Sequence, residues 1–146
     1  MFRYVSGPLN GDFSKHIMSA KRWGIPDELK EKGISEENIK TFEVGGSLEL
    51  PFASKVIAEG NFKPDVIIAL GVVIRGETTH YDLVSEVTYQ GLMNVQLETG
   101  IPIIFGVLTC ENLEQVIARI SASDQNKGKE FANTALLQIA LLNSNK

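Results

Sequence analysis

The sequence contains a single cysteine, Cys110, and only two histidines, His16 and His80. One thiol cannot form a disulfide within the chain, and a structural zinc site needs several clustered thiolate or imidazole ligands. The sequence therefore predicts neither a disulfide-stabilised domain nor a metal centre. Cys110 could act as a nucleophile near a strand end or simply pack as a buried thiol. We favour packing because no histidine is adjacent to it in sequence.

Long apolar runs and a dominant charge are also missing. The longest apolar run, residues 66–74, is far shorter than the roughly 20 residues that span a bilayer. The first residues lack the apolar stretch and small-residue cleavage site of a secretory signal, so we expect a cytoplasmic protein without membrane association. The formal net charge is -4, and Lys and Arg are scattered among Asp and Glu. Nucleic acid is therefore not an expected partner.

The overall composition is that of one ordinary globular domain. The chain has 146 residues, of which 43% are hydrophobic and 22% are charged, close to globular averages. It shows no internal repeat, low-complexity stretch or linker. We therefore predict a single domain over residues 1–146.

Two apolar runs rich in Ile and Val, residues 66–70 and 103–108, do not alternate with polar residues, which is typical of parallel strands covered on both faces. A capping box at Thr79 and Asp82 predicts a helix after the first run, ending at Gly100 and Pro102. Its apolar positions are Val84, Val87, Gly91 and Val95. A second helix, capped by Asn112, is expected after residue 108, with its apolar side made by Leu113, Val116, Ile117 and Ile120.

Strands are also expected at residues 2–5 and 39–44, and helices at 49–59, 127–142 and 15–32, the last broken near Gly24 and Pro26. Strands that alternate with helices predict an α/β fold with a parallel sheet between two helix layers. Ligands bind such sheets at the carboxyl ends of the strands. This rule draws attention to three loops, residues 45–49, 75–80 and 109–112.

The loop at residues 75–80 joins a buried strand to a helix, so its backbone amides and the helix amino terminus could hold an anion such as phosphate. His80 at the helix start could exchange protons near neutral pH. The alternative is that Thr79 only caps the helix and His80 faces water.

Gly45 and Gly46 permit a close backbone approach to a ligand, and Glu49 could accept hydrogen bonds from it. A tight turn followed by a glutamate that favours a helix start explains the same residues. Arg119 could bind a phosphate through its planar guanidinium, or be an ordinary solvated helix residue.

Four motifs in one order resemble those of the lumazine synthase family. Residues 71–82, GVVIRGETTHYD, are similar to its central signature, and residues 46–51, GSLELP, to its Gly-(Ala/Ser)-aromatic-Glu-(Ile/Leu)-Pro turn. Residues 105–109, FGVLT, resemble its fourth-strand motif. The carboxyl-terminal order is repeated by Asn112 to Gln115, Arg119 and Asn126 to Gly128. The similarity covers residues 36–140 and implies a flavodoxin-like, three-layer αβα sandwich with a central four-stranded parallel sheet.

The resemblance implies a transferase that condenses 5-amino-6-ribitylaminouracil with 3,4-dihydroxy-2-butanone 4-phosphate. The products are 6,7-dimethyl-8-ribityllumazine, phosphate and water, and neither a metal nor a redox cofactor takes part. By that likeness His80 would transfer protons during imine formation and phosphate loss. The phosphate would be held by Arg119, Thr78 and the amides of Gly76 and Glu77. The substrate-binding residues would be Leu9, Ser47, Leu48, Glu49, Val72, Val73, Ile74, Phe105 and Lys127.

The same resemblance implies a homo-oligomer, because family members form pentamers, some of which assemble into icosahedral shells. Phe105, Arg119 and Lys127 would reach a neighbouring subunit's site, and riboflavin synthase is a candidate partner. The sequence departs from the family at Leu9 and Leu48, where aromatic rings are usual. Ring stacking worth on the order of 1 kcal/mol is lost at each. The alternatives are therefore a non-catalytic relative that binds flavin or ribityllumazine, a shell-forming subunit, or a flavodoxin-like domain of other function.

Overall fold

The computed structural model describes residues 22–61, 63–121, 123 and 125–146, and the backbone of residues 2–6. Its sheet has the strand order β2-β1-β3-β4. Every neighbouring pair runs parallel. This confirms the predicted α/β class with a parallel sheet. The strands are β1 (Phe2–Ser6), β2 (Ile39–Glu43), β3 (Val66–Ile74) and β4 (Ile103–Cys110).

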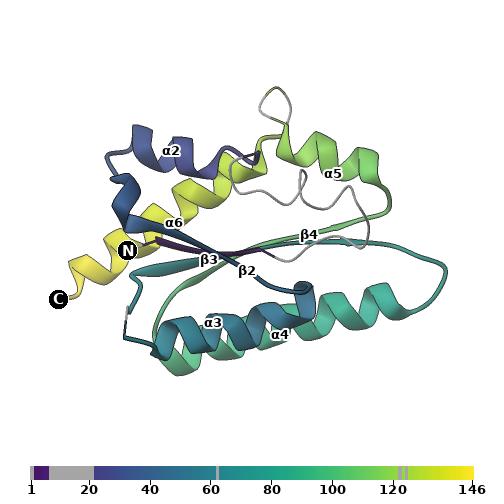
Figure 1. Ribbon diagram of the computed structural model, residues 1–146, viewed down its shortest axis with the longest axis horizontal. Coiled ribbons are helices and arrows are strands. Elements are labelled where there is room, and N and C mark those ends of the chain that lie inside the picture. Colours follow the sequence, from purple (N-terminus) through teal and green to yellow (C-terminus); the bar gives the residue numbers. More distant parts are fainter. Residues whose placement is uncertain (1, 7–21, 62, 122, 124) are drawn as a thin grey trace.

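Helices cover both faces of the sheet (Figure 1). On one face lie α3 (Leu50–Glu59) and α4 (His80–Thr99). The other face carries α2 (Ile25–Glu31), α5 (Leu113–Ile120) and α6 (Lys127–Ser144). Two short 3-10 turns, η1 (Glu36–Asn38) and η2 (Ser47–Glu49), precede β2 and α3. Within the described part of the chain, no helix is long and apolar enough to cross a membrane.

The side chains of β3 point alternately into two cores. Val66, Ile68 and Leu70 belong to the core under α2, α5 and α6, whereas Ile67 and Ala69 belong to the core under α3 and α4. Both faces are covered, so the run contains no polar residue. The predicted strand ends at residues 70 and 108 were wrong. Pairing continues to Ile74 and Cys110, and Gly71 lies within β3, packed beneath neighbouring side chains, and does not end it.

Helix α4 begins and ends where expected, but not with the predicted cap. The Thr79 backbone is already helical and its side chain makes no capping bond, so the capping box with Asp82 was wrong. The Thr79 carbonyl oxygen instead accepts bonds from the amides of Asp82 and Leu83. Gly100 ends the helix in the left-handed conformation, with φ of 69°. Its buried residues are Val84, Thr88, Leu92 and Val95, and the expected core residue Val87 is 57% exposed.

The predictions for helices α5 and α2 were correct except for one side chain of α5. Asn112 caps α5 as expected, because its Oδ1 atom accepts a bond of 2.9 Å from the Gln115 amide. Ile117 was placed on the apolar side of this helix, but it is 42% exposed. The expected break near Gly24 and Pro26 agrees with the structure, because α2 begins only after Gly24, which is left-handed with φ of 72°, and has Pro26 in its first turn. The earlier part of that predicted helix, residues 15–21, lies outside the described residues.

Packing of α2 on α6 brings the segment around Trp23 into the core. Trp23 is 1% exposed, and its ring lies 6.2 Å from the ring of Phe131. The Asn133 side-chain amide donates a 3.3 Å bond to Glu28. A Cβ atom at Gly128 would lie 1.7 Å from the Trp23 carbonyl oxygen, so only glycine permits this approach. The two helices therefore close one face of the sheet.

Candidate active site

A cavity of about 380 Å³ lies where β3 ends, between η2 and the start of α4. This is the position at which parallel sheets bind ligands. Two of the three loops singled out in the sequence reach it, residues 45–49 directly and residues 75–80 through His80. The lining residues are Gly45, Gly46, Ser47, Leu48, Glu49, Val72, Val73, Ile74, His80 and Val84.

The η2 turn can lie against the strand because Gly71 has no side chain. A Cβ atom there would be 2.8 Å from the Ser47 hydroxyl oxygen and 3.2 Å from Leu50 Cδ1. Such distances are too short for van der Waals contact, so a larger residue would displace the turn. Ser47 is consequently buried, whereas Leu48 at the cavity mouth is 46% exposed.

The Glu49 carboxylate lies against the backbone of the preceding glycines. A Cβ atom at Gly46 would be 3.0 Å from Glu49 Oε2, and one at Gly45 would be 3.7 Å from it. Gly46 has an extended backbone that any residue adopts, so space rather than conformation favours glycine there. The carboxylate is exposed and free to accept bonds from a bound hydroxyl or amide.

His80 is the first residue of α4, and it lines the same cavity as the η2 turn. Its backbone amide donates a 3.3 Å bond to the Thr78 hydroxyl. That hydroxyl therefore accepts from the chain and keeps its own hydrogen for a ligand. Gly76, Glu77 and Thr78 lie in the exposed loop just before His80, beside the cavity rather than in its lining.

Arg75, the first residue of the loop at residues 75–80, contacts three side chains. Its Nε atom lies 3.0 Å from Glu111, its Nη1 atom 3.5 Å from Asp82, and its guanidinium carbon 4.2 Å from the centre of the Tyr81 ring. The hydrogen bond to Glu111 is the main reason that the pKa of Arg75 is raised above its ordinary value. The third predicted loop, residues 109–112, thus contacts the loop at residues 75–80 through Glu111, but it does not line the cavity.

Sequence reasoning missed the contacts of Arg75 and the place of Val84 in the lining. Val84 lies one turn after His80, so helical spacing could have found it. No local pattern indicated that Arg75 would meet Glu111, because the two residues follow different strands and lie 36 positions apart.

Three other expected site residues lie elsewhere in the subunit. Phe105 lines a second cavity of about 310 Å³ between α4 and α6, and its ring is 5.8 Å from Tyr89. Arg119 is on α5 and donates a 3.0 Å bond to the Gln115 carbonyl oxygen of its own helix. Lys127 begins α6 and pairs with Glu130 at 2.7 Å. Leu9 lies outside the described residues.

Cys110 is also away from the cavity. It is 1% exposed and belongs to the core under α2, α5 and α6. Burial raises the pKa of its thiol, and the charge of Arg119 opposes this effect more weakly. A thiol in this state is a poor nucleophile at neutral pH.

The cavity brings an imidazole and a carboxylate together over an apolar floor of valine and isoleucine side chains. Within the described residues, no group of three or more His, Cys, Asp and Glu side chains is placed to hold a metal ion. Such a floor suits a flat ring, and the polar groups suit proton exchange and hydroxyl recognition.

Residues 8–143 match the model of the family described as 6,7-dimethyl-8-ribityllumazine synthase. The chain therefore belongs to this family, whose members are transferases of riboflavin biosynthesis.

Proposed function

We propose that the protein condenses 5-amino-6-ribitylaminouracil with 3,4-dihydroxy-2-butanone 4-phosphate to give 6,7-dimethyl-8-ribityllumazine, phosphate and water. The observation that supports this most directly is that His80 and Glu49, from different elements, line one cavity. The family match agrees with the same chemistry.

Each part of the cavity has a role in this proposal. The pyrimidine ring packs on Val72, Val73 and Ile74, and the Ser47–Glu49 turn binds its polar edge and the ribityl chain. His80 accepts and returns protons as the amine attacks the ketone and as phosphate leaves. The phosphate binds at the loop of Gly76, Glu77 and Thr78, where the hydroxyl of Thr78 has a hydrogen to donate. Holding the two reactants in contact contributes much of the rate increase.

The remaining site residues act between subunits in this proposal. Arg119 and Lys127 do not line the cavity of their own chain, and Phe105 lines a different one. A homopentamer, able to build icosahedral shells, would bring them to a neighbour's cavity, and Leu9 would join the same site. Large apolar side chains exposed on α3 and α4 support such an assembly, namely Phe52, Val56, Leu83, Val87 and Leu97. Riboflavin synthase, which would consume the product, is a proposed partner of this cytoplasmic enzyme.

The proposal also covers the finer description of the fold. The strand order and the helices on both faces support a flavodoxin-like, three-layer αβα sandwich with four parallel strands. We propose that it forms a single domain over residues 1–146.

The decisive experiment mixes the purified protein with both substrates and follows lumazine absorbance and fluorescence against an enzyme-free control. We expect faster product formation, and the same rate in the presence of a chelator, because no clustered ligand set surrounds His80 and Glu49 in the described part of the chain. Loss of activity in chelator that an added metal restores would contradict the mechanism. Tight binding of flavin or lumazine without turnover would instead support the non-catalytic alternative, which rests on leucine in place of an aromatic ring at Leu9 and Leu48.

A further inference from the structure

The turn that presents His80 has few apolar contacts to hold it. Residues 75–80 are all exposed, and Val84 is the first buried residue of α4. Tyr81 is half-buried against the core beneath this helix. A turn that projects from the core in this way needs polar contacts to keep one orientation.

Arg75 supplies such contacts, and its own backbone is fixed by the pairing of β3 with β4. Its backbone amide bonds to the Cys110 carbonyl oxygen at 2.9 Å, which continues the pairing of β3 with β4. From there the guanidinium reaches Asp82 and Tyr81, the two residues that follow His80, and Glu111, which follows β4. The planar guanidinium can bond to carboxylates and stack on a ring at the same time.

We propose that Arg75 is a positioning residue, which fixes the first turn of α4 to the end of β4 and thereby holds the His80 imidazole at the cavity. Arg75 itself does not line the cavity, so it acts through His80. The catalytic part of this inference rests on the proposed function.

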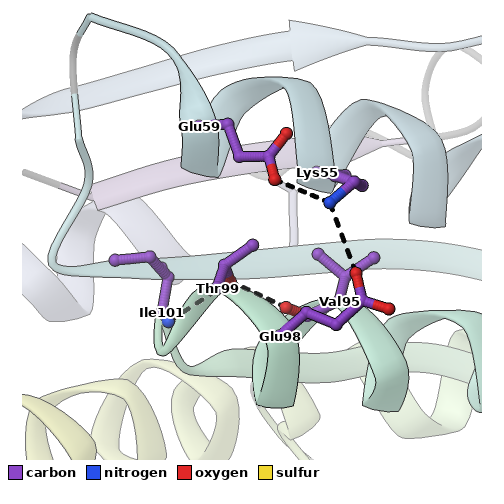
Figure 2. A network of polar contacts seen from close by, with 6 residues as sticks. All are labelled: Lys55, Glu59, Val95, Glu98, Thr99 and Ile101. Carbon is purple, nitrogen blue, oxygen red and sulfur yellow. Dashed lines mark hydrogen bonds and ion pairs between the residues drawn. The ribbon is translucent and has the colours of Figure 1, made fainter.

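A second ion-pair network provides a matched control (Figure 2). Lys55 of α3 lies 2.6 Å from Glu59 and 3.3 Å from Glu98 of α4. Its side chain is 40% exposed, against 41% for Arg75, but it joins the helices at the end away from the cavity. Lys55→Ala therefore removes a similar set of surface ion pairs without touching the turn at His80.

The first measurement needs no turnover. Hydrogen exchange followed by mass spectrometry reports the amides of residues 76–83, among them those of Asp82 and Leu83 that bond to Thr79. We expect Arg75→Ala to accelerate exchange in this segment, and Lys55→Ala to leave it unchanged. Equal exchange in wild-type and Arg75→Ala protein would overturn the inference.

The second measurement uses lumazine formation. We expect Arg75→Ala to lower kcat by about tenfold with little change in either KM, because a displaced base slows chemistry more than binding. Arg75→Lys should recover part of this loss, since lysine keeps the charge but cannot span both carboxylates. Lys55→Ala should retain wild-type kcat.

A double-mutant cycle separates positioning from a general structural role. If Arg75 acts through His80, adding Arg75→Ala to a His80→Ala protein should cause no further loss. The same loss in both backgrounds would overturn the inference while leaving the proposed function intact. A wild-type protein without turnover would instead refute the proposed function, and hydrogen exchange alone would then decide whether Arg75 holds the turn.

Discussion

The backbone of Gly71 in β3 faces the Ser47 hydroxyl so closely that a Cβ atom at Gly71 would lie 2.8 Å from Ser47 Oγ. This contact sets how near the η2 turn approaches the strand, and η2 includes Glu49. The distance between the two walls of the cavity therefore depends on one residue that is outside its lining.

We predict that Gly71→Ala lowers the free energy of unfolding by about 1–3 kcal/mol, because the added methyl group overfills a packed position. It should also raise the KM for the pyrimidine, since Ser47 and Glu49 move. Thermal unfolding and steady-state kinetics measure both effects. Gly76→Ala is the stability control, because a Cβ atom there meets nothing within 4 Å. Unchanged unfolding of Gly71→Ala would show that the turn is not held by this contact.

We predict that His80→Ala lowers turnover by roughly ten- to a few hundred-fold and leaves phosphate binding nearly intact. This loss of turnover is at or below the lower end of the losses usual for removal of a general acid–base group. We expect a small loss because the uncatalysed condensation already proceeds and water can replace the imidazole. Calorimetry with inorganic phosphate on both proteins is the control. Normal turnover by a correctly folded variant would mean that His80 only begins the helix.

We predict that Arg119→Ala raises the KM for the butanone phosphate roughly 10- to 150-fold, because the variant loses one charge-assisted hydrogen bond to the phosphate. The KM for the pyrimidine should change much less. Equal changes in both constants would show that Arg119 does not hold the phosphate.

The position of Arg119 outside its own chain's cavity adds a test of shared sites. Arg119→Ala and His80→Ala subunits, co-expressed in equal amounts, should form mixed rings in which about a quarter of the sites have both native side chains. Assayed at low butanone phosphate, these rings should be more active than either variant alone. Activity no higher than the mean of the two variants would place His80 and Arg119 in the same subunit's site.

We predict that iodoacetamide labels Cys110 far more slowly in the folded protein than in urea. Burial raises the pKa of this thiol, so less thiolate is present at any pH below that value. The labelling rate should therefore increase with pH through a midpoint above about 8.5, the ordinary thiol value. Cys110→Ala gives the background. Rapid labelling of the folded protein at pH 7 would contradict the buried state.

The parts of the fold that the sequence predicted are those in which local pattern and tertiary environment agree. The uninterrupted Ile and Val run of β3 requires cover on both faces, and α2, α5 and α6 on one side and α3 and α4 on the other provide it. Asn112 caps α5 through a bond to an amide three residues later, which is a local interaction. The helix expected at residues 49–59 is α3, and its first turn contains Pro51, where the missing backbone amide hydrogen costs little.

The predictions that were wrong or missing concern interactions that a local sequence pattern does not reveal. Thr79 fits a capping pattern, but its backbone is helical and Thr78 bonds the His80 amide instead. Val87 and Ile117 have the spacing of core residues, and spacing cannot show whether another part of the same subunit covers them. Arg75 can meet Glu111 only after β3 and β4 pair. The sequence therefore predicted the loops that form the candidate site, but not the side-chain contacts between these loops.

Strand β1 lies between β2 and β3, both of which follow it in the chain. Among the strands that the structure describes, β1 is synthesised first and must therefore wait for its two partners. Its residues Phe2 and Ser6 pair with Val66 and Leu70, so the middle of the sheet closes only after β3 has been synthesised. Until then the edge of β1 that faces β3 is unpaired, and the growing chain depends on late, long-range contacts to complete its fold.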